Sequence, residues 1–353
     1  MVADKRFHSV MHDKPRLLIT MGDVAGIGPE IIARGWQELV SFSRPAVIGD
    51  PAHLHAAVDL IASAAVVETI LELDRSEPSG KVIPCLSGTD QDLSRVRAGR
   101  VSATAGKAAY DFLCLATDKL LAGDADAMVT APLHKEGLRA AGLPYPGHTE
   151  ILAERTRTPH YGMMLFADGL GVVHVTLHMA LREVFRHLTK ESVVEKIRLL
   201  HEIMGRLVDG APRIGVAALN PHASDGGLFG DEEARIIQPA VMVAQKEGID
   251  AAGPFPSDTL FVRARSGEFD GIVAMYHDQG HIALKLLGGL RAVNITVGLP
   301  IVRTSVAHGT AYDIAGRGIA DATSLIEAAR VAARLANQNR HEGAKATRSV
   351  LNA

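Results

Sequence analysis

Short apolar runs alternate along the chain with longer segments in which apolar residues recur every three or four positions. The short runs predict β-strands at 16–20, 46–49, 127–130, 172–176, 214–219, 271–275 and 292–297. The longer segments predict amphipathic helices at 104–121, 191–207, 231–246 and 321–336. Strands that alternate with helices are typical of βαβ units, so we expect an α/β fold with mostly parallel sheets.

Three of the expected strands run out into a histidine, in the segments 171–178, 214–222 and 271–277. One histidine in such a place is more often a structural, hydrogen-bonded residue. Neutral imidazole is also the commonest transition-metal ligand, and turn sequences rather than further core follow all three segments. The repeated placement therefore predicts a metal-assisted enzyme.

Other polar residues also follow the expected strands. In open parallel sheets ligands gather at the carboxyl ends of the strands, so one edge of the sheet is expected to carry the chemistry. The residues concerned are 21–23, 132–135, His178, 220–222, 277–278 and Arg303. A length of 353 residues favours two domains, with the site in a cleft.

Composition narrows the classes of function. A hydrophobic content of 47%, with 22% charged residues, is that of an ordinary soluble globular protein. The formal net charge is −3 and no basic stripe is present, which argues against a nucleic-acid partner. Residues 1–14 have no apolar signal-peptide core and no long apolar run occurs, so we expect a cytoplasmic protein without membrane contact. Cys85 and Cys114 are expected to be packing residues.

Several local motifs leave alternatives open. The segment 22–32 follows a strand and opens a helix with Pro29 in its first turn; it is either an anion-binding loop or an ordinary tight turn, and matches neither dinucleotide nor P-loop patterns. Thr149 reads best as a helix cap. The segments 142–147 and 253–257 predict rigid turns, and the chain from about 337 onward is expected to fray.

Taken together, the motifs closely resemble the 4-hydroxythreonine-4-phosphate dehydrogenase family, over about residues 17–330. The most specific segments are 22–30, 146–150, 219–222, 276–280 and 298–305. The resemblance implies homodimers with a two-domain fold like that of isocitrate and isopropylmalate dehydrogenases, with the active site in the interdomain cleft at the dimer interface. We expect a cofactor-side domain of residues 1–135 plus 290–353 and a metal, substrate and dimerisation domain of residues 136–289.

The resemblance also implies site residues. It implies one divalent metal ion per site, whether zinc, cobalt, magnesium, manganese or nickel, held by His178, His222 and His277, with His277 supplied by the dimer partner. Substrate contacts are implied for His148, Thr149, Lys285, Asn294 and Arg303. The segment 308–316 resembles the loop that the related dehydrogenases fold around the adenosine of NAD, which nominates His308, Gly309, Thr310 and Asp313 for the cofactor.

The implied reaction is NAD-linked oxidation of the secondary hydroxyl of a small phosphorylated hydroxy acid to a β-keto acid that decarboxylates. The ion lowers the pKa of the hydroxyl, Lys285 orients the anionic substrate and takes part in catalysis, and Asp258 is a candidate base.

The substrate itself is less determined. Val24 and Ala307 depart from the usual family residues, and segments 311–315 and 145–148 look more like a catabolic branch that acts on 4-phospho-D-threonate or 4-phospho-D-erythronate than like the biosynthetic enzyme acting on 4-phosphohydroxy-L-threonine. The alternatives are a cis-dihydrodiol carboxylate dehydrogenase, a metal-dependent hydrolase or aldolase without nicotinamide, and a non-catalytic metabolite sensor.

Overall fold

The computed structural model describes residues 14–75 and 77–351, which form two compact units. Unit 1 contains the described residues up to Thr158 together with those from Leu299 onward, and unit 2 is Pro159–Gly298. These units have other ends than the domains expected from the sequence. Residues 136–158 join unit 1 because α6 (His148–Arg155) packs on α4 (Ala103–Leu121), and β11 (Val293–Val297) joins unit 2 because it pairs with β6 (Gly162–Ala167). The N-terminal segment used to argue against a signal peptide lies almost wholly outside the described residues.

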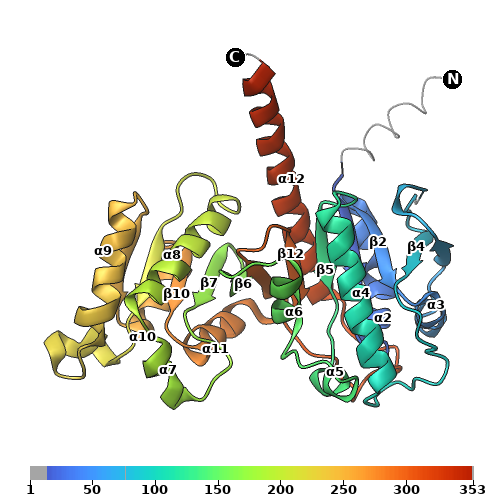
Figure 1. Cartoon of the computed structure of the whole chain (residues 1–353), viewed down its shortest axis with the longest axis horizontal. Helices are drawn as coiled ribbons and strands as arrows, with labels where there is room; N and C mark the ends of the chain where they lie inside the picture. The colour runs from blue at the N-terminus through green and yellow to red at the C-terminus, as the bar shows by residue number, and fades with distance from the viewer. Residues whose placement is uncertain (1–13, 76, 352–353) are drawn as a thin grey trace. The chain divides into compact units, whose positions relative to one another are not determined.

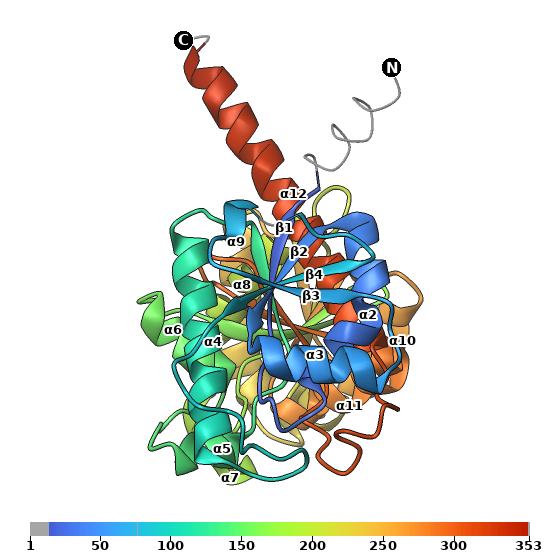
Figure 2. The same cartoon turned by 90° about the vertical axis from the view of Figure 1, so that its right-hand side faces the viewer.

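Unit 1 is a parallel sheet with the strand order β3-β4-β2-β1-β5-β12. Helix α4 covers one face of this sheet, and α2, α3 and α12 also contact the sheet. Figure 2 shows α4 and α2 on opposite sides of the strands. The remaining bounds are β1 (Arg16–Thr20), β2 (Arg44–Gly49), β3 (Val66–Ile70), β4 (Val82–Ser87), β5 (Ala127–Thr130), β12 (Arg303–Val306), α2 (Gly28–Phe42), α3 (Pro51–Leu60), α5 (Lys135–Ala140) and α12 (Thr323–Leu351).

Unit 2 has the strand order β11-β6-β7-β10-β8-β9, in which β6 runs antiparallel to both neighbours and the other pairs are parallel (Figure 1). A buried cluster that includes Leu165, Val172, Leu260, Ile272 and Leu284 joins the sheet to α10 and α11. The bounds are β7 (Leu170–His174), β8 (Ile214–Ala217), β9 (Ala251–Phe255), β10 (Gly271–Ala274), α7 (Leu181–His187), α8 (Lys190–Gly205), α9 (Gln238–Lys246), α10 (Ser257–Arg265) and α11 (His277–Gly288).

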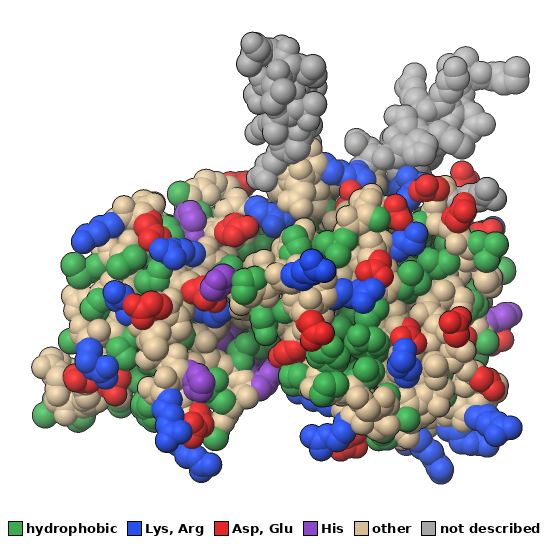
Figure 3. Space-filling model, in the orientation of Figure 1, with side chains coloured by type: hydrophobic (Ala, Val, Ile, Leu, Met, Phe, Trp, Pro, Cys, Tyr) green, Lys and Arg blue, Asp and Glu red, His purple; other side chains and the backbone are tan. Residues whose placement is uncertain are grey.

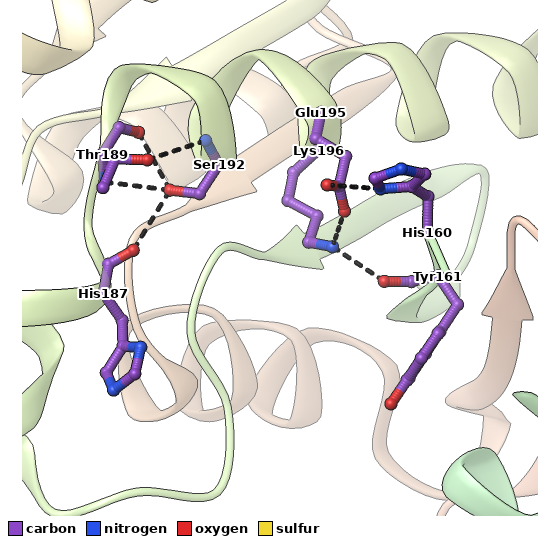
Figure 4. Close-up of polar contacts among 7 residues, drawn as sticks. All are labelled: His160, Tyr161, His187, Thr189, Ser192, Glu195 and Lys196. Carbon is purple, nitrogen blue, oxygen red and sulfur yellow. Dashed lines mark hydrogen bonds and ion pairs between the residues drawn. The ribbon is translucent and has the colours of Figure 1, made fainter. Parts of the chain in front are cut away.

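Polar contacts fix helix α8 at its start and along its length (Figure 4). Thr189 and Ser192 form a reciprocal capping box, which satisfies two of the amide groups that a helix leaves without intrahelical partners. Further along, Lys196 Nζ donates to the Tyr161 carbonyl at 2.7 Å and lies 2.6 Å from Glu195 Oε1. These contacts tie α8 to the segment that leads into β6.

All seven predicted strands and all four predicted helices are present, which confirms the α/β class. Two expectations were wrong, one about a turn and one about the end of a helix. Residues 253–255 lie in β9 rather than in a turn; β9 is an edge strand next to a register shift, where a proline removes no essential ladder bond. Helix α12 continues to Leu351, past residue 337, from which the chain was expected to fray.

The surface and the cysteines agree with the composition. Figure 3 shows acidic and basic side chains interspersed over the visible face, without a field of one sign. Cys85 and Cys114 are buried and free, as expected for packing residues. Within the described part of the chain, no helix combines the length and the apolar character that crossing a membrane requires.

Candidate active site

Four imidazoles gather in unit 2 at the carboxyl ends of β7 and β10. The ring centroids of His178 and His277 are 5.6 Å apart, and those of His277 and His281 are 3.8 Å apart with nearly parallel planes. His281 Nδ1 lies 3.0 Å from Nε2 of His174, the last residue of β7. Because His277 opens α11, its ring is carried by the turn that follows β10, as the strand pattern predicts.

His174 is the buried member of this group, with no exposed surface. Gly280 makes its place possible, since a Cβ at that position would lie 2.5 Å from His174 Nε2. Burial, and then the charge of His281, lower the pKa of His174 to about 3. Burial, and then the charge of His277, lower the pKa of His281 to about 4. Both rings are therefore neutral at pH 7.

His222 lies on a turn, Pro221–Gly227, of unusual backbone conformation. Four consecutive non-glycine residues, His222 to Asp225, have φ values of 52°, 55°, 68° and 45°. The left-handed region costs an L-residue about 1–2 kcal/mol. The turn therefore persists only because its surroundings hold it in place.

The buried carboxylate of Glu233 holds this turn by hydrogen bonds. Glu233 Oε1 accepts from the amides of Leu219 and Asn220 at 2.8 and 2.7 Å, and Oε2 accepts from Asn220 Nδ2 at 3.0 Å and from the Ser224 hydroxyl. Burial raises the pKa of Glu233, but the hydrogen bonds from Asn220 and Ser224 outweigh it, so the pKa is lowered and the carboxylate stays charged.

A pocket of about 260 Å³ adjoins the turn, lined by residues that include His222, Asp258 and Gln279. Gln279 braces its walls: Nε2 donates to the Ala218 carbonyl and to Ser257 Oγ, both at 2.7 Å, and Oε1 accepts from the Met275 amide at 2.6 Å. The exposed Asp258, in the first turn of α10, thus lies in the same pocket as His222.

The donor chemistry of the predicted ligands suits a divalent ion, since imidazoles bind zinc, nickel and other divalent transition metals. His277 Nδ1 lies 2.8 Å from Asp278 Oδ1, the kind of second contact that orients a metal-binding ring. Yet no group of three or more His, Cys, Asp or Glu residues arranged for a metal occurs among the described residues of this one chain. The structure brings His178 and His277 together and does not add His222 to them.

Unit 1 holds a second group, around Arg303. This side chain is only 1% exposed, and its Nη2 donates to Thr130 Oγ1 at 2.7 Å. Burial lowers the pKa of Arg303 to about 9, which leaves it charged at pH 7. Burial, and then the charge of Arg303, hold the pKa of His148 well below its usual range, so His148 is neutral. A buried cation beside a neutral imidazole is an environment that favours an anionic ligand.

The other predicted substrate residues are distributed over both units. Thr149 is not the cap of α6: the helix begins two residues earlier than expected, so the capping position is Gly147, and no side chain caps that end. Lys285 lies in the last turn of α11. Asn294 lies on β11, and its Oδ1 is buried without a hydrogen-bond partner among the described residues, which fits an acceptor reserved for a ligand.

The predicted cofactor loop, 308–316, packs on the glycine-rich turn 22–28. The Thr310 carbonyl accepts from the Ile27 amide at 3.1 Å, and a Cβ on Gly26 would lie 2.9 Å from Thr310. The Tyr312 hydroxyl donates to Asp23 Oδ2 at 2.7 Å. Burial raises the pKa of Asp23, against the hydrogen bonds that it accepts. The turn therefore serves as a seat for the loop, and α2 starts directly after it with Pro29 in its first turn, as predicted.

Residues 41–332 match the family described as "Pyridoxal phosphate biosynthetic protein PdxA". The chain belongs to this family. It is 48% identical over 327 residues to a 4-hydroxythreonine-4-phosphate dehydrogenase of Beijerinckia indica, covering 92% of this chain and 96% of the relative. It is 46% identical over 332 residues to the D-threonate 4-phosphate dehydrogenase of Cupriavidus necator, covering 92% and 98%.

A solved structure gives the same assignment. The 4-hydroxythreonine-4-phosphate dehydrogenase of Klebsiella pneumoniae is 40% identical, with a TM-score of 0.83, and the match covers 92% of this chain and 100% of that one. These findings confirm the resemblance inferred from the motifs. This PdxA-family protein is an oxidoreductase of the dehydrogenase type.

Sequence reasoning on this PdxA-family chain missed the residues that support the predicted ligands. His174, His281, Glu233 and Gln279 have no motif of their own in a single sequence, although Gln279 and His281 flank the glycine of the segment 277–281. The sequence indicates Tyr312 only as a member of the predicted cofactor loop 308–316. Position was a signal for Gln279 and His281, which lie within four residues of His277, whereas His174 lies inside a predicted strand and Glu233 inside a predicted helix.

Proposed function

We propose that this protein oxidises the secondary hydroxyl of a small phosphorylated hydroxy acid, with NAD as the acceptor of the hydride. The names of the relatives carry the proposal, since all the quoted ones are dehydrogenases of 4-hydroxythreonine 4-phosphate or D-threonate 4-phosphate. The buried cation at Arg303 supports it, because such a site favours an anionic group of the substrate. The expected product is a β-keto acid that loses carbon dioxide.

In this proposal the chain's own residues hold the substrate. Arg303 and Lys285 supply positive charge for its phosphate or carboxylate, and Asn294 supplies the buried acceptor for a hydroxyl. His148 and Thr149, at the start of α6, donate or accept single hydrogen bonds. Asp258 takes the hydroxyl proton. An Asp258→Asn variant with normal turnover and normal metal content would remove that assignment.

His178, His222 and His277 are the proposed ligands of a divalent ion. Such an ion supplies Lewis-acid chemistry, lowering the pKa of a hydroxyl near it. The chain's contribution is to present three imidazoles and to orient them through neighbours such as Asp278. The loop with His308, Gly309, Thr310 and Asp313 is the proposed seat of NAD, already fixed against the turn 22–28.

The deciding experiment follows NADH absorbance with 4-phosphohydroxy-L-threonine and 4-phospho-D-threonate, offered separately to metal-loaded and to chelator-treated protein. Metal-dependent reduction of NAD with one of them establishes the reaction and selects the branch. If neither reacts while the protein still binds metal, the proposal is wrong, and dihydrodiol carboxylates or hydrolysis without nicotinamide become the substrates and the reaction to test.

Subunit mixing tests the dimer implied by the resemblance. If the ligands come from two chains, inactive His222→Ala and inactive His277→Ala subunits should restore part of the activity when mixed. Mixing His178→Ala with His277→Ala then decides which ligand crosses. Restoration means that the two histidines of one site come from different chains, as the resemblance implies. No restoration means that they come from one chain, in which their rings here lie 5.6 Å apart.

A further inference from the structure

Loop 219–225 of unit 2 carries His222 in a conformation that its sequence does not favour. The four residues from His222 to Asp225 are left-handed, and glycine, the residue that adopts this region readily, first occurs at 226. Runs of left-handed residues are not a regular structure of L-amino acids. Something outside the turn must therefore determine its shape.

Among the described residues, the carboxylate of Glu233 bonds both to the start of this loop and to its left-handed run. It accepts from the Leu219 and Asn220 amides where the loop leaves β8, and from the Ser224 hydroxyl in the middle of the left-handed run. The residue is 4% exposed, so these bonds form away from water, where a carboxylate must be fully satisfied to be tolerated.

A second feature aims this carboxylate at the loop. Glu233 begins a π-helical turn, Glu233–Ile237, directly before α9, whereas the sequence predicts one regular amphipathic helix over 231–246. A π-turn adds a residue to the helix and rotates the side chains before it, and such turns are frequent at functional sites. The neighbouring Glu232 makes one contact, from Asn220 Nδ2 at 2.7 Å.

We propose that Glu233 is the positioning residue that holds loop 219–225 in its left-handed form and thereby presents His222 to the pocket that it shares with Asp258. The role of His222 in this proposal rests on the proposed function, but the hold on the loop does not. In this proposal Glu233 touches neither substrate nor metal; it acts through the backbone amides and the side chains of the loop.

Glu233→Gln is the sharpest test, because the amide keeps the shape of the side chain. A carboxylate has only acceptors, whereas a glutamine places an NH2 group against donors in either orientation. Glu232→Gln is the matched control, since it removes a neighbouring charge at the same helix start and leaves the Glu233 contacts intact. The full-length protein is used throughout, with Co²⁺ as the metal probe.

Two readouts are expected to move together. Hydrogen exchange of the Leu219 and Asn220 amides should be faster in Glu233→Gln by about tenfold, the effect of losing about one hydrogen bond. The dissociation constant for Co²⁺ should rise by about 10–100-fold, the usual cost of losing support behind a ligand. Saturating Co²⁺ should then return kcat toward that of the wild type. Glu232→Gln should resemble the wild type in both.

Wild-type exchange at these amides in Glu233→Gln would overturn the inference, as would wild-type Co²⁺ affinity in a protein whose wild type binds Co²⁺. If the wild type neither binds Co²⁺ nor reduces NAD, the proposed function fails, and the exchange measurement still decides the hold on the loop. If Glu233→Gln does not fold, Ser224→Ala replaces it. Ser224→Ala removes one of the donors to the Glu233 carboxylate and should show the same two changes at a smaller size. If Ser224→Ala changed neither the amide exchange nor the Co²⁺ affinity, that result would count against the inference.

Discussion

Lowering the pH should destabilise unit 2 through His174. This imidazole has no exposed surface, and its pKa is about 3 in the folded chain against an ordinary value of 6.5. Because the folded pKa is depressed, the unfolded chain takes up a proton below pH 6.5 that the folded chain refuses until about pH 3. The contribution to the free energy of unfolding is therefore complete above pH 6.5 and declines as the pH falls through the window between these values.

The size of the effect follows from the two pKa values. Each pH unit within the window costs up to about 1.4 kcal/mol, so the step from pH 7 to pH 5 should remove about 2 kcal/mol from the free energy of unfolding. His174→Gln removes the titrating group and keeps a polar side chain beside His281. His55→Gln, at a side chain that is 65% exposed, controls for the loss of an imidazole as such.

Urea unfolding at pH 7, 6 and 5, followed by a probe in unit 2, measures the difference. The wild type and His55→Gln should lose about 2 kcal/mol more than His174→Gln between pH 7 and 5. The absolute stability of His174→Gln at pH 7 does not enter, because only the change with pH is compared. Equal pH dependence in all three proteins would show that burial of His174 does not exclude its proton, and the reasoning would be refuted.

Two substitutions probe other close contacts. Gly280→Ala should lower the melting temperature by the equivalent of about 1–3 kcal/mol, because the added Cβ would lie 2.5 Å from His174 Nε2. Thermal melts measure this, with Gly205→Ala as the control, since Gly205 is also helical and a Cβ there would have no neighbour within 4 Å. Tyr312→Phe removes the hydroxyl that donates to buried Asp23 and should cost about 1–3 kcal/mol of stability while raising KM for NAD more than KM for the substrate, measured by steady-state kinetics and urea unfolding.

The predicted strands are all found, whereas β3, β4, β6, β9 and β12 were not predicted, although β6 and most of β4 are buried. The strand at 127–130 was placed to the residue, because a strand buried on both faces is a continuous apolar run. Edge strands have a weaker hydrophobic pattern in the sequence. Strand β3 is largely exposed and β9 contains Gly253 and Pro254, so neither has the composition of a buried strand.

The candidate site divides in the same way. Residues that follow a strand, such as His178 and His277, were nominated because strand ends are visible in a hydrophobic pattern, and the structure places these two rings together. Their supports were not found, because each contact joins distant parts of the chain. Asp23 and Tyr312 are separated by 289 positions. A single sequence contains no signal for such a pair.

The left-handed turn at His222 shows why the supports matter as much as the ligands. Nothing in the residues from His222 to Asp225 predicts their conformation, and in isolation they would leave it at a gain of about 1–2 kcal/mol each. A charged carboxylate that accepts four hydrogen bonds out of water is strong enough to oppose that tendency. The identity of a proposed ligand therefore does not by itself make the site: a relative that kept His222 but lost Glu233 would be expected to present its imidazole in many orientations and, if the proposed metal role holds, to bind a metal weakly.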